Sequence, residues 1–284
     1  MRRMEALSPP LTLSVSLVLF HSDIERFAQT VRSLAAAVTY AKNVDRLRQV
    51  SLVVLDNSTD PGYAESARQA MAIAVEGQSA ISSRYVVAPA NTGYGGGHNL
   101  AAQEVGSDLH LVLNPDVDLA EQALAQGVEE LLDPTVVLVA PRVTADDGTP
   151  EFLCRRYPSV LVLLLRAFAP AVIRRQFVSR LDRYEMRDVC SGTDRADIVL
   201  ASGCFMLLRS AAFRAVGGFD ERYFLYFEDY DLSMRLAGEG ALHFQPAMAI
   251  VHHGGYAASK GWRHIGLFIR SGYRFFRQYG WQWI

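Results

Sequence analysis

Cysteine is scarce in this sequence. Cys154, Cys190 and Cys204 make an odd number, and no two of them have the C-x-x-C spacing of a metal or redox pair. We therefore expect neither a disulfide framework nor a structural zinc site, and a reducing compartment suits the chain best.

Long apolar runs are absent as well. A membrane-spanning helix needs about 18 consecutive apolar residues or more, and the run Val160–Leu165 already ends at Arg166. At the N-terminus, Arg2 and Arg3 precede an apolar run at Leu11–Phe20, but no A-x-A-like cleavage site follows it. The sequence therefore predicts a buried first strand at this place and no membrane span.

Acidic residues are missing from one end of the chain. No Asp or Glu occurs from Gly240 to Ile284, although the chain as a whole carries a net charge of only −2. The segment from Arg155 to Arg187 is similarly basic. These two segments suggest contacts with something anionic, although a solvated basic face is the commoner explanation. The near-neutral total gives no indication of a nucleic-acid partner.

What the sequence does have is a regular alternation of short apolar runs and longer helical stretches. Its 284 residues, about half of them apolar, fit one large α/β domain with a modest C-terminal extension. The alternation predicts right-handed βαβ units and a mostly parallel sheet. We expect one domain over 11–258, followed by a basic amphipathic helix over 259–284. Strands are predicted at Leu13–Phe20, Val50–Leu55, Tyr85–Ala88, Leu109–Leu113, Val136–Ala140 and, interrupted at Gly203, Ile198–Leu208; helices are predicted at Ile24–Val38, Ala64–Val75, Leu119–Leu132, Ser210–Val216 and Glu228–Ala237.

Four successive predicted strands end in polar or glycine-rich residues, at 21–23, 56–58, 91–99 and 114–116. Open parallel sheets bind ligands beyond the carboxyl ends of their strands. If the strands are parallel, all four groups lie along one rim of the sheet. The sequence therefore predicts a ligand site there, rich in carboxylates, amides and free backbone N–H groups.

Two of these groups have a recognisable chemistry. Asp116 and Asp118 follow a strand, and carboxylates suit Mg²⁺ or Mn²⁺ bound together with substrate phosphates; Asp after a strand is also a common turn or cap residue, and Asp118 is the predicted N-cap of helix 119–132. The glycines of 91–99 allow close approach to a ligand. That segment is neither a dinucleotide fingerprint, because His98 replaces a required glycine, nor a P-loop. A flexible loop before a helix is the alternative.

Two later segments also carry reactive side chains. Glu228 and Asp229 lie at the start of a predicted helix, where its dipole is expected to stabilise them as anions. A general base there would rely on closeness to its hydroxyl more than on a raised pKa. Asp231 and Arg235, four residues apart, predict a structural ion pair. His252 and the histidine after it follow a strand-like run, and they either bind a metal or phosphate or have no such role.

Taken in order, these segments resemble a known family. The stretches "LVVLDNSTD", "NTGYGGGHNLA", "LVLNPDVDL", "ASGCFMLLRSAAFRAVGGFDERYFLYFEDYDLSMRL" and "AIVHHGG" are similar to the large inverting glycosyltransferase family with the GT-A fold. The similarity is strongest to its rhamnosyltransferase-like branch, which builds bacterial O-antigen lipopolysaccharide and other surface polysaccharides. The match covers roughly Leu13 to Gly255.

The resemblance implies roles for particular residues. Asp229 matches the catalytic base and Glu228 its neighbour at the acceptor. Metal ligation is implied for Asp116, with Asp118 assisting and His252 near the metal and the diphosphate. The chain departs from the family pattern at Asn114, where the first acid of the D-x-D motif is usual, and at His98, where Asn is usual. Contacts with the donor are implied for Asp56, Asn91, Gly93, Gly96, Asn99 and Asn114.

The implied activity is that of an inverting hexosyltransferase that depends on Mg²⁺ or Mn²⁺. It would transfer rhamnose from a dTDP-sugar onto a hydroxyl of a glycan or lipid-linked glycan. A nucleotidyltransferase of similar fold is disfavoured, because the first strand ends at His21–Asp23 without a glycine-rich basic loop. A non-catalytic sugar-nucleotide binder is disfavoured by the complete set of Asp116, Asp229 and His252. The exact donor, the acceptor, the linkage and the oligomeric state stay open.

The C-terminal helix suggests where such an enzyme works. At 100° per residue its arginines form one stripe and its large apolar residues lie opposite. Such a helix suits the anionic inner surface of the cytoplasmic membrane, where a peripheral enzyme meets lipid-linked acceptors. Packing of the apolar face onto the catalytic domain is the alternative. The stripe consists of Arg263, Arg270, Arg274 and Arg277, and the apolar face of Ile265, Phe268, Ile269, Phe275 and Phe276, with Trp262 and Tyr273 at its edge.

Overall fold

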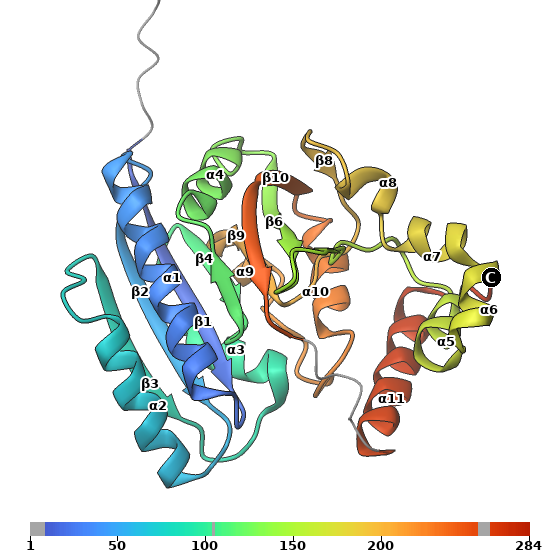
Figure 1. Ribbon diagram of the computed structural model, residues 1–284, viewed down its shortest axis with the longest axis horizontal. Coiled ribbons are helices and arrows are strands. Elements are labelled where there is room, and N and C mark those ends of the chain that lie inside the picture. The colour runs from blue at the N-terminus through green and yellow to red at the C-terminus, as the bar shows by residue number, and fades with distance from the viewer. Residues whose placement is uncertain (1–8, 104–105, 255–261) are drawn as a thin grey trace, which may run out of the picture.

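The computed structural model describes residues 9–103, 106–254 and 262–284. Within that part of the chain the strands form a single sheet with helices packed on both faces (Figure 1). The strands are β1 (Leu11–Leu19), β2 (Leu47–Asp56), β3 (Ile81–Val87), β4 (Leu109–Leu113), β5 (Val117–Leu119), β6 (Val136–Thr144), β7 (Pro150–Glu151), β8 (Ala196–Asp197), β9 (Phe205–Arg209) and β10 (Ala241–His252). The helices are α1 (Ile24–Asn43), α2 (Pro61–Ala74), α3 (Gly93–Gln103), α4 (Ala123–Glu130), α5 (Val160–Phe168), α6 (Ala171–Gln176), α7 (Val178–Tyr184), α8 (Arg187–Cys190), α9 (Ser210–Ala215), α10 (Glu228–Leu236) and α11 (Trp262–Tyr279).

The order of the strands is β3-β2-β1-β4-β9-β6-β10-β5, with β7 beside β6 and β8 beside β10. The first four run parallel to one another, as the alternation of strands and helices predicted. The short β9 is antiparallel to both β4 and β6, and β10 returns parallel to β6. The long strands therefore all point one way, and the prediction of a mostly parallel sheet is confirmed.

Helix capping places two polar groups at the carboxyl rim. The Asp23 carboxylate accepts a hydrogen bond of 2.9 Å from the backbone N–H of Arg26 and caps α1. Asp60 caps α2 in the same way, with Pro61 at the first helical position. These short connections start each helix directly after its strand, so the residues between them are held at the rim.

The prediction of a helix from Leu119, capped by Asp118, is wrong. Residues 117–119 form β5, which pairs antiparallel with the end of β10, and α4 begins only at Ala123. Val117 and Leu119 are buried while Asp118 between them is less so. This alternation of period two spans three residues, too few to be distinguished from the start of an amphipathic helix in the sequence alone.

The predicted strand at 198–208 is shorter than expected. The regular strand β9 begins at Phe205, and the residues before it cross to Arg155, whose backbone exchanges two hydrogen bonds with Leu200. The predicted break at Gly203 therefore marks the end of an irregular stretch that leads from the Arg155–Leu200 bridge to β9.

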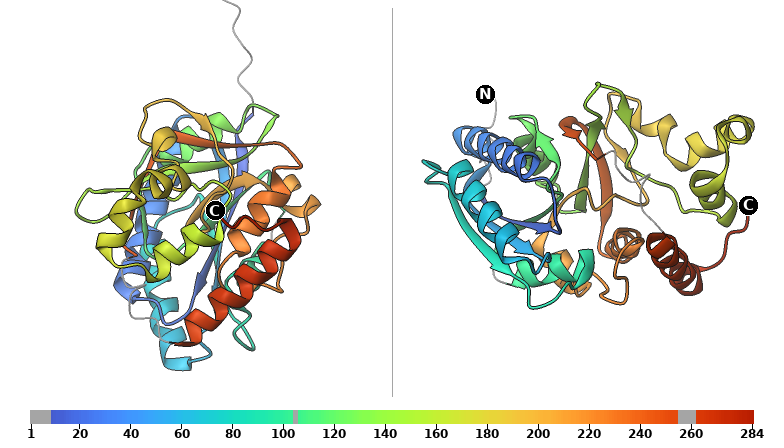
Figure 2. Two further views of the ribbon diagram at one scale, coloured as in Figure 1. Left: turned by 90° about the vertical axis from the view of Figure 1, so that its right-hand side faces the viewer. Right: turned by 60° about the horizontal axis from the view of Figure 1, so that its bottom comes forward.

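The C-terminal helix α11 packs on the catalytic domain through part of the predicted apolar face. Phe275 and Phe276 are buried against Tyr223 and Phe227, while Ile269, assigned to the same face, is exposed. The residues after α11 lie against α5, and the two lie side by side in Figures 1 and 2. The predicted domain boundary at 258/259 falls outside the described residues. No helix in the described ranges combines the length and apolarity needed to cross a bilayer.

Candidate active site

A crevice of about 340 Å³ lies at the carboxyl rim of the parallel strands. Its walls come from all four groups that the strand ends predicted, including Ser22, Asn57 and Asn91. Asn114, Pro115 and Asp116, after β4, complete that side. The opposite wall comes from Phe224, Leu225, His264 and Leu267, in segments that the sequence did not connect with the rim.

The glycine-rich segment is helical and not a flexible loop. Residues 93–103 form α3, and Gly93 starts it at φ +79°. A Cβ on Gly93 would lie 2.3 Å from the carbonyl oxygen of Phe224, the group that accepts a 3.0 Å hydrogen bond from the Tyr94 N–H. Only glycine allows both the left-handed backbone and this close approach. Gly93 therefore lets the carboxyl rim of the sheet contact the backbone at Phe224.

Three of the predicted donor-binding residues lie away from this crevice. Asp56 is fully buried, and its carboxylate accepts hydrogen bonds from Tyr85 Oη and the Ser58 N–H, both of 2.8 Å. The amide of Asn99 is occupied by the backbone N–H and carbonyl of Phe219. Gly96 is buried beside Thr92 in the first turns of α3. Asn57, which the sequence did not single out, lines the crevice beside Gly93 and donates to its carbonyl at 2.9 Å.

His98, which stands where Asn is usual in the family pattern, does not line this crevice either. It is fully buried, and its Nδ1 lies 2.7 Å from Ser16 Oγ. Burial lowers the pKa of His98 well below its usual value, so the ring is neutral at physiological pH. Its position indicates a role in packing α3 against β1.

Asp116 and His252 come together at the edge of the crevice. Asp116 Oδ1 lies 3.7 Å from His252 Nε2, and it is buried without a hydrogen-bond partner among the described residues. Next to them, a Cβ on Gly254 would lie 2.4 Å from His252 Nε2 and 3.2 Å from Asp116 Oδ2. An unpaired carboxylate oxygen, an imidazole nitrogen and a space kept clear by glycine fit a divalent cation that takes its other ligands from phosphate and water.

Asp118 does not join this pair. Its carboxylate lies 3.0 Å from His253 Nε2, and His253 also contacts Asp146. Asp118 lies within β5, opposite Val251 of β10, whereas Asp116 precedes the strand in the turn after β4. Within 9–103, 106–254 and 262–284, no three His, Cys, Asp or Glu residues form a metal-holding cluster.

Glu151 orients His252, and nothing in the sequence indicated it. Its Oε2 lies 2.9 Å from His252 Nδ1. With the Nδ1 proton directed at this carboxylate, Nε2 keeps its lone pair on the side of Asp116. A carboxylate behind a histidine is the usual support of a histidine that binds metal.

Asp229 lies at the start of α10 and is joined to the rim through Gly203. Its Oδ2 accepts a 3.0 Å hydrogen bond from the Gly203 N–H, and the Gly203 carbonyl accepts one from Tyr94 Oη. The same Tyr94 hydroxyl lies 3.1 Å from Asn114 Oδ1. Asp229 is therefore connected to the 114–116 turn through the backbone of Gly203 and the side chains of Tyr94 and Asn114. Before it, Tyr226 and Phe227 both have positive φ, a costly backbone that is commonest at functional sites.

Burial changes the electrostatics expected of the two acids. Desolvation raises the pKa of Glu228 well above its usual value, with the neighbouring Asp229 charge adding to the effect. Desolvation also raises the pKa of Asp229, although the N–H groups of Gly203 and Tyr230 oppose it. The expectation that the helix dipole would keep both acids strongly ionised is therefore wrong. A dipole worth about 1 kcal/mol does not offset the loss of water around a carboxylate.

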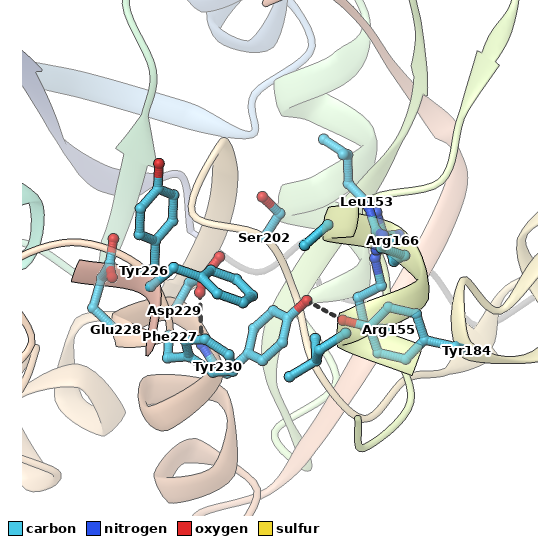
Figure 3. Close-up of a pocket in the computed structure, with 13 residues that line it drawn as sticks. Leu153, Arg155, Arg166, Tyr184, Ser202, Tyr226, Phe227, Glu228, Asp229 and Tyr230 are labelled. Carbon is cyan, nitrogen blue, oxygen red and sulfur yellow. Dashed lines mark hydrogen bonds between the residues drawn. The ribbon is translucent and has the colours of Figure 1, made fainter. Parts of the chain in front are cut away.

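A second cavity, of about 360 Å³, is lined by both Glu228 and Asp229 (Figure 3). Its walls are aromatic, with Tyr226, Phe227 and Tyr230 on one side and Tyr184 opposite. The hydroxyls of Tyr184 and Tyr230 lie 2.6 Å apart. Arg155 and Arg166 complete it; the basic bias of 155–187 was the only sequence signal for them. Asp229 therefore lines the aromatic cavity and is linked through Gly203 to Tyr94 in the crevice wall, so it is placed to take a proton from a molecule bound in the cavity.

Comparison with known proteins relates this chain to named rhamnosyltransferases. No family model matches the sequence. An N-acetylglucosaminyl-diphospho-decaprenol L-rhamnosyltransferase of Mycobacterium tuberculosis is 28% identical over 82% of this chain and 77% of its own length. The rhamnosyltransferase WbbL of Escherichia coli K12 is 47% identical, but over only 18% of this chain and 20% of its own.

Solved structures share the fold at low identity. A mannosyltransferase from Pyrobaculum calidifontis in complex with GDP-Man and Mn²⁺ superposes with a TM-score of 0.62 at 15% identity, over 94% of this chain and 65% of that one. GalNAc-T7 with UDP, GalNAc and Mn²⁺ gives 0.61 at 15%, over 87% of this chain and 44% of that one. This chain thus spans less than two thirds of either structure.

The chain has the GT-A fold, and its relatives in sequence indicate a glycosyltransferase. Among such enzymes, this chain is rhamnosyltransferase-like.

Proposed function

We propose that this chain is an inverting, metal-dependent rhamnosyltransferase that uses dTDP-rhamnose as donor and a lipid-linked glycan as acceptor. The observation that carries the proposal is that Asp229 lines the aromatic cavity and is linked by hydrogen bonds, through Gly203, to Tyr94 in the wall of the rim crevice. The donor would occupy the crevice and the acceptor the cavity. Synthesis of O-antigen lipopolysaccharide or another surface glycan is the setting that the family resemblance favours.

The chemistry follows from this arrangement. An acceptor hydroxyl in the aromatic cavity attacks the anomeric carbon of the donor from the face opposite the diphosphate. The new C–O bond forms as the bond to the diphosphate oxygen breaks, and Asp229 takes the hydroxyl proton. Its raised pKa makes it a better base than an ordinary Asp. The nucleoside diphosphate leaves through the crevice, and inversion needs no covalent intermediate.

Asp116 and His252 would hold Mg²⁺ or Mn²⁺ beside the diphosphate, with Glu151 orienting the histidine. The ion would offset the negative charge that develops on the departing nucleoside diphosphate. The Mn²⁺ in the two solved relatives supports a divalent ion here.

A screen of nucleotide-sugars tests the proposal, because slow donor hydrolysis needs no acceptor. We expect dTDP-rhamnose to be hydrolysed to dTDP and rhamnose faster than UDP- or GDP-hexoses. Preferential turnover of a UDP-hexose would contradict the donor assignment. Pyrophosphate as the product would indicate a nucleotidyltransferase, and tight donor binding without any turnover would indicate a binding protein.

We also propose that the enzyme docks peripherally on the inner face of the cytoplasmic membrane, through α5–α7 and the C-terminal residues. Because α11 turns much of its apolar face inward, it is not the main contact. The residues after α11 lie beside α5, where the N–H groups of Val160 and Leu161 donate to the carbonyls of Gln282 and Trp283. Exposed arginines surround an apolar surface there, as an anionic bilayer requires. That surface consists of Leu164, Phe168, Val172, Ile173, Val178, Trp281, Trp283 and Ile284.

Liposome flotation tests this docking. Binding is expected to need anionic lipid, to weaken with salt, and to fall several-fold when Arg174 and Arg175 of α6 both become Glu, since each Arg near the surface contributes about 1 kcal/mol. The matched control replaces Arg32 and Arg68, on α1 and α2 at the other end of the molecule, by Glu (Figure 1). Arg274 is unsuitable because its guanidinium stacks on Tyr223. Equal loss in both double variants, or no flotation at all, would refute the docking surface.

A further inference from the structure

Arg155 is a buried cation without an anionic partner. Its exposed fraction is 8%, and within the described part of the chain its guanidinium donates only to the neighbouring Cys154 carbonyl, at 2.9 Å. It also lies 5.7 Å from the centre of the Tyr184 ring. Among the described residues, no carboxylate lies within ion-pair distance of it. Burying an unpaired charge is costly, so this cation is expected to meet an anion that enters the cavity.

Arg166 brings a second guanidinium to the same wall. Its Cζ lies 5.4 Å from the centre of the same Tyr184 ring, so both cations share one aromatic face or edge. The carboxylate nearest to it is that of Glu185, at 3.7 Å, which is longer than a hydrogen bond and is shared with Arg187. About a third of the Arg166 side chain is exposed, so Arg166 lies at the mouth of the cavity and Arg155 lies deeper in it.

The two cations face the acids across the cavity. In Figure 3, Arg155 and Arg166 gather on the side opposite Tyr226 and Glu228, and Asp229 lies between. A ligand that presents a hydroxyl to Asp229 would therefore place its other end beside two guanidinium groups. The planar guanidinium of Arg can donate two parallel hydrogen bonds to phosphate oxygens. Two adjacent guanidinium groups therefore suit a ligand with two phosphates.

We propose that Arg155 and Arg166 bind the diphosphate of a lipid-linked sugar diphosphate, whose sugar hydroxyl lies at Asp229. The inference rests on the proposed function and names the acceptor class of the same site. The volume of about 360 Å³ accommodates one sugar and its phosphates. The lipid would leave past Leu163, Ala167 and Phe268, which line the same cavity on α5 and α11. These are the helices that border the exposed apolar surface, so the lipid would run toward the bilayer.

Calorimetric binding of two acceptor analogues, without donor and with EDTA, tests the inference. One analogue is N-acetylglucosaminyl diphosphate on a short prenyl chain. The other joins the same sugar to the same chain through an ether and lacks the phosphates. The wild type is expected to bind the diphosphate analogue at least about tenfold more tightly, as charge-assisted hydrogen bonds allow.

Arg166→Ala is expected to remove most of that preference and leave the ether analogue unaffected, while Arg166→Lys restores part of it. Arg32→Ala, an exposed arginine on α1 at the other end of the molecule (Figure 1), is the control and should change nothing. Arg155→Lys tests the deeper cation, with circular dichroism to confirm folding. Equal affinity of the wild type for both analogues, binding of neither, or a parallel loss for both in Arg166→Ala overturns the inference. Donor hydrolysis, measured separately, reports on the proposed function, so the two can fail independently.

Discussion

Asp229→Asn is expected to lower kcat at least ~10²-fold while donor affinity changes little. The substitution keeps the shape of the side chain but removes the basic oxygen that would take the acceptor proton. One oxygen remains to accept a hydrogen bond from the N–H of Gly203 or of Tyr230, so the first turn of α10 should stay in place. Steady-state kinetics with a soluble acceptor analogue and calorimetric binding of the donor give the two quantities.

The pH profile provides a second readout of the same residue. A base acts only when deprotonated, and burial raises the pKa of Asp229. Activity of the wild type should therefore fall as the pH drops through a value above that of an ordinary Asp, and Asp229→Asn should lose this acidic limb.

Glu228→Gln is the matched control for the base. Glu228 is buried one residue away, and one of its oxygens has no hydrogen-bond partner among the described residues. We expect this variant to keep the acidic limb and a larger share of kcat. If Asp229→Asn turns over normally and Glu228→Gln does not, the base is Glu228.

Asp116→Ala is expected to abolish transfer, and EDTA is expected to silence the wild type until Mn²⁺ or Mg²⁺ is restored. Asp116 carries the unpaired oxygen beside His252, the position at which a cation would meet the diphosphate. Without that cation, the negative charge on the leaving group would remain uncompensated. Mn²⁺ binding in the presence of dTDP, followed by electron paramagnetic resonance, separates loss of metal from loss of fold.

Asp118→Ala is the control, because the structure places its carboxylate with His253 and not with Asp116. This variant should still bind Mn²⁺ with dTDP and should respond to EDTA as the wild type does. Full activity after thorough chelation would exclude a metal from the mechanism. Loss of Mn²⁺ in Asp118→Ala at unchanged folding would instead return Asp118 to the ligand set.

The parallel half of the sheet and its rim followed from the sequence. Strands β1, β2 and β4 end in buried apolar residues, at 17–19, 52–55 and 111–113, and these runs stop where the chain reaches the rim. Right-handed crossovers then force successive strand ends to the same edge. For this reason the polar groups around Asn57, Asn91 and Asp116 could be placed together before any coordinates were known.

Only the tertiary structure decided how individual side chains at that rim are used. Asn99 and Asp56 occur in motif positions, yet the packing of the 218–221 segment and of Tyr85 occupies their polar atoms. Asp118 was separated from Asp116 by the pairing of β5 with the distant β10. Each of these outcomes depends on a neighbour far away in the chain, and local periodicity carries no information about it.

The cavity opposite the rim shows the same limit. Arg155, Tyr184 and Asp229 come from three separate segments, and the raised pKa of Asp229 depends on how completely they exclude water. The sequence supplied the residue types of the site, because chemistry requires acids, an imidazole and aromatics. Desolvation and long-range contacts are properties of the packed molecule, so charge states and ligand geometry were determined only by the tertiary structure.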